Sequence, residues 1–149
     1  MGVNYYVYLK DTAGFSVGAF ADYCKRFGLQ IKMPENLDLR NASGVLSMQL
    51  TGEHLGELSA ELGLSMQECP KVSPRNDAPV ELTDFEQAVR SSRFVLALRC
   101  SDVPSEALAA HLLGAYLAQM PEGVFVNHRT GAYYTAAAPM EEIIRQMIG

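Results

Sequence analysis

The sequence predicts an α+β fold, a single domain over residues 1–149 in which helices and a largely antiparallel sheet form a two-layer sandwich. Three observations support this prediction. The chain has 149 residues and 48% hydrophobic content, which suits one domain with a sizeable core. Its apolar residues alternate in some segments, as in half-buried strands, and recur at helical spacing in others. No Gly-rich loop follows a strand in the spacing typical of nucleotide-binding parallel sheets.

The chain divides into two halves, residues 1–68 and 83–149, joined by the proline-rich segment 69–82. Each half is expected to run strand, helix, strand, strand. This echo of element order suggests duplication, although it does not extend to residue identity.

The first predicted element is a half-buried strand over residues 4–10, where side chains alternate with period two. We expect one face of this strand to lie on the core and the other to face outward. The inward residues are Tyr5, Val7 and Leu9, and the outward residues are Tyr6, Tyr8 and Lys10.

A helix is expected next, capped by Ser16 and ended by Gly28, because apolar residues recur three and four positions apart between them. Leu29–Met33 and Gly44–Leu50 are rich in apolar residues over strand lengths and are predicted to be strands.

Glu53–Glu68 is the most unusual segment, with four glutamates and no Lys or Arg in a chain of net charge −5. We interpret it as a helix whose apolar stripe is Leu55, Leu58 and Leu62. Its glycines would each weaken such a helix by about 1 kcal/mol relative to alanine.

Within this expected helix, Glu53, Glu57 and Glu61 are successive neighbours four positions apart, and their repulsion costs a few tenths of a kcal/mol per pair. Because the glutamates are present despite this cost, we interpret them as a surface that binds a basic partner. The alternative is a helix face that is merely solvated.

The second half begins with a capping box, Thr83 and Glu86, which predicts a helix through Ser91. The apolar run Phe94–Leu98 predicts a central strand covered on both faces. Asp102 is expected to cap a long helix, residues 104–120.

The chain is expected to end with a hairpin and a helix. Gly123–Val126 and Ala132–Thr135 flank a polar loop with a glycine, which is typical of two paired strands. The last helix is predicted to begin at Pro139. Six residues on the apolar sides of their elements are expected to be nearly inaccessible: Phe20, Phe27, Leu96, Leu98, Leu112 and Ile143.

Two arrangements of reactive side chains are conceivable. Cys100, Asp102 and His111 could form a nucleophilic triad, but a buried thiol has a high pKa and is inert, and Cys100 continues an inward-facing series. His54 could bind a metal ion with Glu53 or Glu57, although a solvated helix face is the commoner meaning of such spacing. We therefore expect no metal and no cofactor.

Aromatic and basic side chains suggest two binding surfaces. Tyr6 and Tyr8 would stand side by side on the outward face of the first strand, as interface anchors do, unless a helix of the same chain covers them. The second surface is a small-molecule pocket between the long helix and the hairpin, formed by His111, His128, Arg129 and Tyr133.

These features favour a non-enzymatic, cytoplasmic protein-binding domain. The contact surface would be Glu53, Glu57 and Glu61 with Tyr6 and Tyr8, and the partner a basic protein. A bacterial immunity protein or antitoxin has this character. An acidic chain with scattered basic residues does not suit nucleic acid, and no apolar run is long enough to span a membrane. The alternatives are a small-molecule-binding domain or small enzyme using the pocket described above, and a homodimer.

Overall fold

The computed structural model describes residues 3–11, 15–53, 55–68, 92–119, 123–127, 130, 132–134 and 137–148. The proline-rich segment 69–82 and the helix expected from Thr83 to Ser91 lie outside these ranges. The described strands are β1 (Val3–Leu9), β2 (Leu29–Lys32), β3 (Ser43–Gly52), β4 (Gly56–Glu68), β5 (Phe94–Cys100), β6 (Val124–Asn127) and β7 (Tyr133–Tyr134). The described α-helices are α1 (Val17–Lys25), α3 (Pro104–Ala118) and α4 (Ala137–Ile148).

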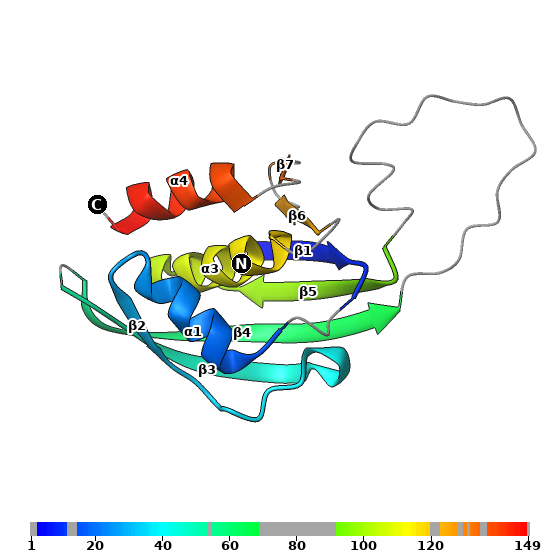
Figure 1. Ribbon diagram of the computed structural model, residues 1–149, viewed down its shortest axis with the longest axis horizontal. Helices are drawn as coiled ribbons and strands as arrows, with labels where there is room; N and C mark the ends of the chain where they lie inside the picture. Colours follow the sequence, from blue (N-terminus) through cyan, green and yellow to red (C-terminus); the bar gives the residue numbers. More distant parts are fainter. Residues whose placement is uncertain are drawn as a thin grey trace, which may run out of the picture.

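The strands form one sheet in the order β2-β3-β4-β5-β1-β6-β7, and every neighbouring pair is antiparallel. The helices pack on one side of it: α3 contacts β1, β4, β5 and β6, α1 contacts β2 and α3, and α4 contacts α3 and β7 (Figure 1). The predicted two-layer α+β fold is confirmed. Strand, helix, strand, strand occurs in both halves, as β1-α1-β2-β3 and β5-α3-β6-β7.

The first strand and first helix form as the sequence predicts. Tyr5, Val7 and Leu9 of β1 are buried, and Tyr6 and Tyr8 lie half-buried on the opposite face.

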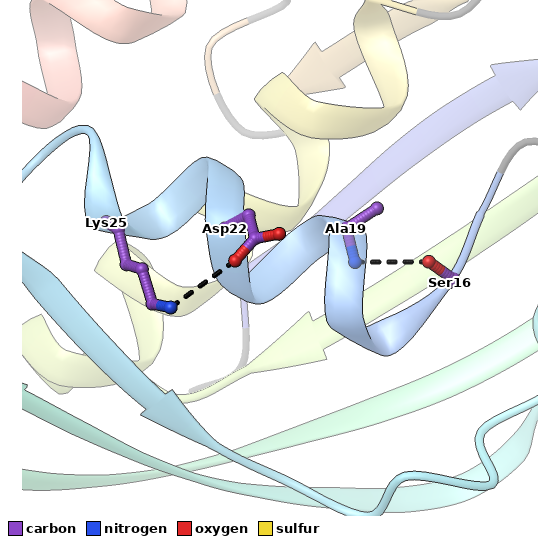
Figure 2. Close-up of polar contacts among 4 residues, drawn as sticks. All are labelled: Ser16, Ala19, Asp22 and Lys25. Atoms are coloured by element: carbon purple, nitrogen blue, oxygen red, sulfur yellow. Dashed lines mark hydrogen bonds and ion pairs between the residues drawn. The ribbon is translucent and has the colours of Figure 1, made fainter.

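At the start of α1, the Ser16 hydroxyl accepts a hydrogen bond from the Ala19 amide at 3.1 Å (Figure 2). At the other end of α1, Nζ of the last residue, Lys25, lies 3.4 Å from a carboxylate oxygen of Asp22, one turn earlier. The chain then leaves the helix through Gly28, whose φ of +74° is a conformation that glycine adopts without strain.

The helix predicted for residues 53–68 is wrong, because Glu53 and Leu55 lie in turns and the segment continues as the strand β4. Leu58 and Leu62 are four positions apart and therefore fit both a helical stripe and one face of a strand. Residues 57–67 nevertheless alternate between polar outward and apolar inward positions, except at Gly63, and Ala60, Leu64 and the half-buried Met66 complete the inward face. Gly56, with a φ of +67°, serves the β3–β4 turn rather than weakening a helix.

The central strand β5 is covered less evenly than predicted. Phe94, Leu96 and Leu98 are buried beneath the helices, but Val95 and Ala97 on the other face are only half-buried.

The long helix is present, but the expected cap is wrong, because Val103 occupies the N-cap position and makes no side-chain capping bond. Glu106 stabilises this end instead, since its carboxylate accepts hydrogen bonds from the Ser101 amide at 2.8 Å and the Ser101 hydroxyl at 2.7 Å.

The core lies between the sheet and α3. Phe20, Leu96, Leu98 and Leu112 are inaccessible as expected. Phe27 and Ile143 are instead half-buried, because they lie at the rim of the helical layer, where the Arg145 guanidinium carbon stands 5.6 Å from the centre of the Phe27 ring. Among the described helices, none has the length and hydropathy that a membrane span needs.

Candidate functional site

The side of the sheet opposite the helices, here called the outer face, carries the predicted contact residues. Strand alternation and register place Glu57, Glu61, Tyr6 and Tyr8 on it together. Glu53 is exposed in the turn between β3 and β4. The structure thus gathers on one surface the residues that the sequence placed on a helix and on a separate strand.

Over β2, β3 and β4 the outer face is polar and exposed, and no helix of the described residues covers it. We call this part the polar face. Its outward residues are Gln30 and Lys32 from β2, Ser43, Val45, Ser47, Gln49 and Thr51 from β3, and Glu57, Ser59, Glu61, Ser65 and Gln67 from β4, all of them exposed.

Over β5, β1 and β6 the outer face is more apolar. Tyr6 lies between Ala97 and Val126, and Tyr8 between Val95 and Val124. All these side chains are half-buried or buried. The two tyrosines therefore lie beside the polar face, two strands away from the glutamates of β4.

The glutamates do not repel one another as they would at the same positions on a helix. Glu57 and Glu61 are four residues apart on a strand, so their backbones lie about 13 Å apart at about 3.3 Å per residue. That spacing exceeds the Debye length of about 8 Å at physiological ionic strength. Their cross-strand neighbours are Thr51 and Ser47, and neither carboxylate has an ion pair within the described residues.

A shallow hollow of about 390 Å³ lies on the polar face. Its lining includes the basic Lys32 and the acidic Glu61, with Ser47, Gln49 and Ser59 between them. Sequence reasoning missed Lys32 and the three uncharged residues because it placed residues 53–68 on a helix. The alternation over residues 57–67 indicates a strand, and a strand in this segment could have been expected to pair with β3.

The triad residues do not form a nucleophilic centre. Cys100 is 4% exposed, and burial, with Glu106 and Asp102 nearby, raises the pKa of its thiol to about 11. The thiol is therefore protonated at neutral pH. Cys24 is also buried, and burial raises the pKa of its thiol to about 12.

His111 is a core residue. It is 6% exposed, and its ring lies 5.2 Å from that of Tyr5 and 5.5 Å from that of Phe125, between centroids. Its Nδ1 lies 2.7 Å from the carbonyl oxygen of Ala107, so the ring donates there. Burial lowers the pKa of His111, which favours the neutral imidazole.

The structure does not bring the four residues of the predicted small-molecule pocket together. His111 is beneath the helices, whereas Tyr133 pairs with Val126 and lies on the outer face, 47% exposed. His128 and Arg129 lie outside the described residues. A hollow of about 360 Å³ does lie between the start of α3 and the hairpin, lined by Val3, Tyr5, Ser101, Asp102, Ala107, Asn127 and Thr130.

The metal site considered from the sequence placed His54 and Glu57 on one helix face, but Glu57 lies on the strand β4, and His54 lies outside the described residues. In the described part of the chain, no three His, Cys, Asp or Glu side chains are grouped to hold a metal ion.

The fold and the outer face define an α+β protein whose sheet has helices on one side and a polar surface over three strands of the other. No protein-family model matches the chain, and no match is found among curated proteins or solved structures.

Proposed function

We propose that this protein is a non-enzymatic binding domain that works in the cytoplasm and holds a basic protein partner against its outer face. The bacterial immunity proteins and antitoxins are the class to which we assign it. The observation that carries the proposal is the polar face, where Glu57 and Glu61 are exposed and have no ion pair within the described residues.

Glutamates on this sheet suit a protein ligand better than glutamates on a helix would. Both glutamates are on the part of β4 that pairs with β3, so their spacing is set by the sheet. Two basic side chains of a partner could meet them without a change in this backbone. Exposed carboxylates of this kind mainly raise the association rate and select the partner, since solvent screens their attraction.

Tyr6 and Tyr8 would supply the apolar part of the contact. Interface anchors are often tyrosines, because the ring buries a large area while its hydroxyl can form hydrogen bonds. Both lie on the same face as the glutamates, and both are half-buried in this chain.

A small-molecule ligand is the second candidate, and the hollow beside the start of α3 is the observation in its favour. Polar groups on its wall already have partners in the chain: Asn127 Oδ1 accepts from the Thr130 amide, and Ser101 donates to Glu106. A ligand would have to compete with these bonds. The exposed polar face carries no such cost, and we favour the protein partner.

The test is affinity purification from native cells with wild type and two charge variants. The double variant Glu57→Gln with Glu61→Gln removes two charges from the polar face. The double variant Asp22→Asn with Glu142→Gln removes two charges from exposed positions on the helices. We expect a basic protein to be retained by wild type and by the helix variant, and to be depleted several-fold by the sheet variant.

Equal retention by all three proteins would contradict the role of the polar face. Equal depletion by both variants would show that only net charge matters. Retention of a small molecule, detected by native mass spectrometry and unaffected by either variant, would favour the second candidate.

A further inference from the structure

The edge of the sheet at β3 is open over half its length. Leu29–Lys32 of β2 pairs only with Gln49–Gly52, so within the described part of the chain Ser43–Met48 has β4 on one side and no strand on the other. The connection from β2 makes its backbone hydrogen bonds within itself and to Met66 of β4, and none to Ser43–Met48. A hollow of about 260 Å³ lies between this connection and the start of β3.

The backbone of this open edge presents unused hydrogen-bonding groups. The Met66 amide donates to the Ala42 carbonyl at 3.0 Å, so the carbonyl group of Ala42, the residue before β3, points toward β4. Bonded positions alternate along an antiparallel strand. The N–H and C=O groups of Ser43, Val45 and Ser47 therefore point away from β4, toward the open edge.

The two parts of this sheet edge differ in the devices that prevent pairing. β2 ends with Lys32, and Pro34 follows two residues later. Charged residues and prolines at a sheet edge discourage the addition of another strand. The open part of β3 reads Ser-Gly-Val-Leu-Ser over residues 43–47, with no charge and no proline. Its central Val45 is 70% exposed.

We propose that a second copy of this chain pairs antiparallel with the open edge of β3, about a two-fold axis at Val45, so that the two sheets become continuous. The segment is self-complementary in this arrangement. Val45 of one copy meets Val45 of the other, and each Ser43 lies opposite a Ser47. No charged side chain of the paired segment opposes another, so the pairing avoids repulsion despite the net charge of −5.

The dimer should be concentration-dependent. A ladder of five residues supplies few backbone hydrogen bonds, and so short a contact falls at the weak end of protein interfaces. Analytical ultracentrifugation of the purified chain should show the weight-average mass rising toward twice the monomer value as concentration increases to hundreds of micromolar.

The variant Val45→Lys should abolish this rise, because it places two like charges opposite each other on the axis. It should fold, since Val45 is mostly exposed. Thr51→Lys is the matched control. Thr51 is exposed on the same face of β3, but its backbone already pairs with Gln30 of β2. The control should dimerise like wild type. A wild type that stays monomeric at every concentration, or a Val45→Lys variant that dimerises normally, would overturn the proposal.

A cross-linking experiment tests the register. Residues that face each other as a hydrogen-bonded antiparallel pair have Cα atoms about 5.5 Å apart. Their Cβ atoms are about as far apart, which exceeds the roughly 3.5 to 4.5 Å of a disulfide, so a short bis-maleimide is the suitable cross-linker. Two of the three cysteines of the chain, Cys24 and Cys100, are buried, so the third, Cys69, is replaced by serine. In this Cys69→Ser background, Val45→Cys should be cross-linked to a dimer by the bis-maleimide, and Thr51→Cys should not. Equal cross-linking of the two would contradict an axis at Val45.

These results are independent of the proposed function. Loss of partner retention in the Glu57 and Glu61 variant leaves the ultracentrifugation outcome unchanged, because both side chains are outside the paired segment.

Discussion

Gly114 shows how closely a single residue controls the packing of this fold. It lies in α3, and a Cβ at this position would overlap the ring of Phe125 in β6 and approach the Met140 methyl group at 3.2 Å. Phe125 and Met140 are inaccessible, so neither can move aside without disturbing the core.

Gly114→Ala should therefore destabilise the protein by about 1–3 kcal/mol, the usual cost of overpacking a core. Chemical denaturation measures this loss. The control is Gly18→Ala in the first turn of α1, where a Cβ would meet nothing within 4 Å. That change should leave stability equal or raise it by up to about 1 kcal/mol, because alanine is the better helix residue. Similar effects at the two sites would contradict the close approach of α3 to Phe125.

His111 should make the fold sensitive to mild acid. Its pKa is lowered in the folded state, mainly by burial, whereas the unfolded chain has a pKa of about 6.5. The unfolded state therefore binds the proton more readily, and stability falls as the pH drops below about 6.5 toward the folded pKa. Above that range the His111 contribution is constant.

The variant His111→Gln cannot titrate and keeps a side-chain donor within reach of the Ala107 carbonyl. The free energy of unfolding, measured by denaturation at pH 5 and pH 7, should drop more for wild type than for this variant. Identical pH dependence would mean that the pKa of His111 is the same in the folded and unfolded states, and that burial does not lower it.

At the scale of elements, β4 is where periodicity decides the structure. A leucine pair four positions apart fits a helix or a strand, and Gly56 and the polar alternation over residues 57–67 distinguish the two. As a strand, β4 contacts β3 along ten residue pairs, from Ser43 opposite Ser65 to Gly52 opposite Gly56. The backbone of β4 also contacts α3, because the Ser105 hydroxyl donates to the main-chain carbonyl of Ser59 at 2.9 Å.

Replacing Glu57 and Glu61 by threonine tests this assignment. Threonine suits an exposed strand position better than glutamate, and it is a poorer helix residue. We expect the double variant to unfold with an unchanged or greater free energy and an unchanged far-ultraviolet circular dichroism spectrum. A clear loss of stability with a loss of helical signal would restore the helical interpretation of residues 53–68.

At the scale of the whole molecule, the helices occupy one side of the sheet, and the exposed glutamates of β4 project from the other. Replacing Glu53, Glu57 and Glu61 together by glutamine should leave stability unchanged, since the strand spacing removes the repulsion that a helix would have had. The association rate with a basic partner should fall several-fold at low salt, and the difference should shrink as salt increases, because exposed charges attract through a screened field.

Stopped-flow measurement of wild type and the triple variant over a salt series determines this effect once the partner is in hand. Equal rates at low salt would show that these glutamates only keep the sheet face solvated. An equal difference at all salt concentrations would indicate close contacts rather than steering.

The sequence alone determined the elements whose signals are local. Alternation in β1 assigned Tyr5 and Tyr6 to opposite faces, the Ser16 hydroxyl and Gly28 bounded α1, and the apolar residues around Leu112 predicted α3. Each of these signals depends on neighbours within one or two turns, which is the range over which capping, backbone conformation and side-chain direction act. The α+β class followed because these elements must bury their apolar sides together.

Only the tertiary structure decided which elements are neighbours and therefore where the candidate site lies. The strand order places β5 and β1 at adjacent positions although about ninety residues separate them, and no local pattern encodes that contact. The same sheet turned the expected acidic helix into β4, because pairing with β3 and β5 satisfies its backbone while Leu62 and Leu64 enter the core. It also made His111 a core residue between Tyr5 and Phe125. Burial and strand pairing are sums over residues distant in sequence. They therefore outweigh a single local feature that fits both a helix and a strand, such as the spacing of Leu58 and Leu62.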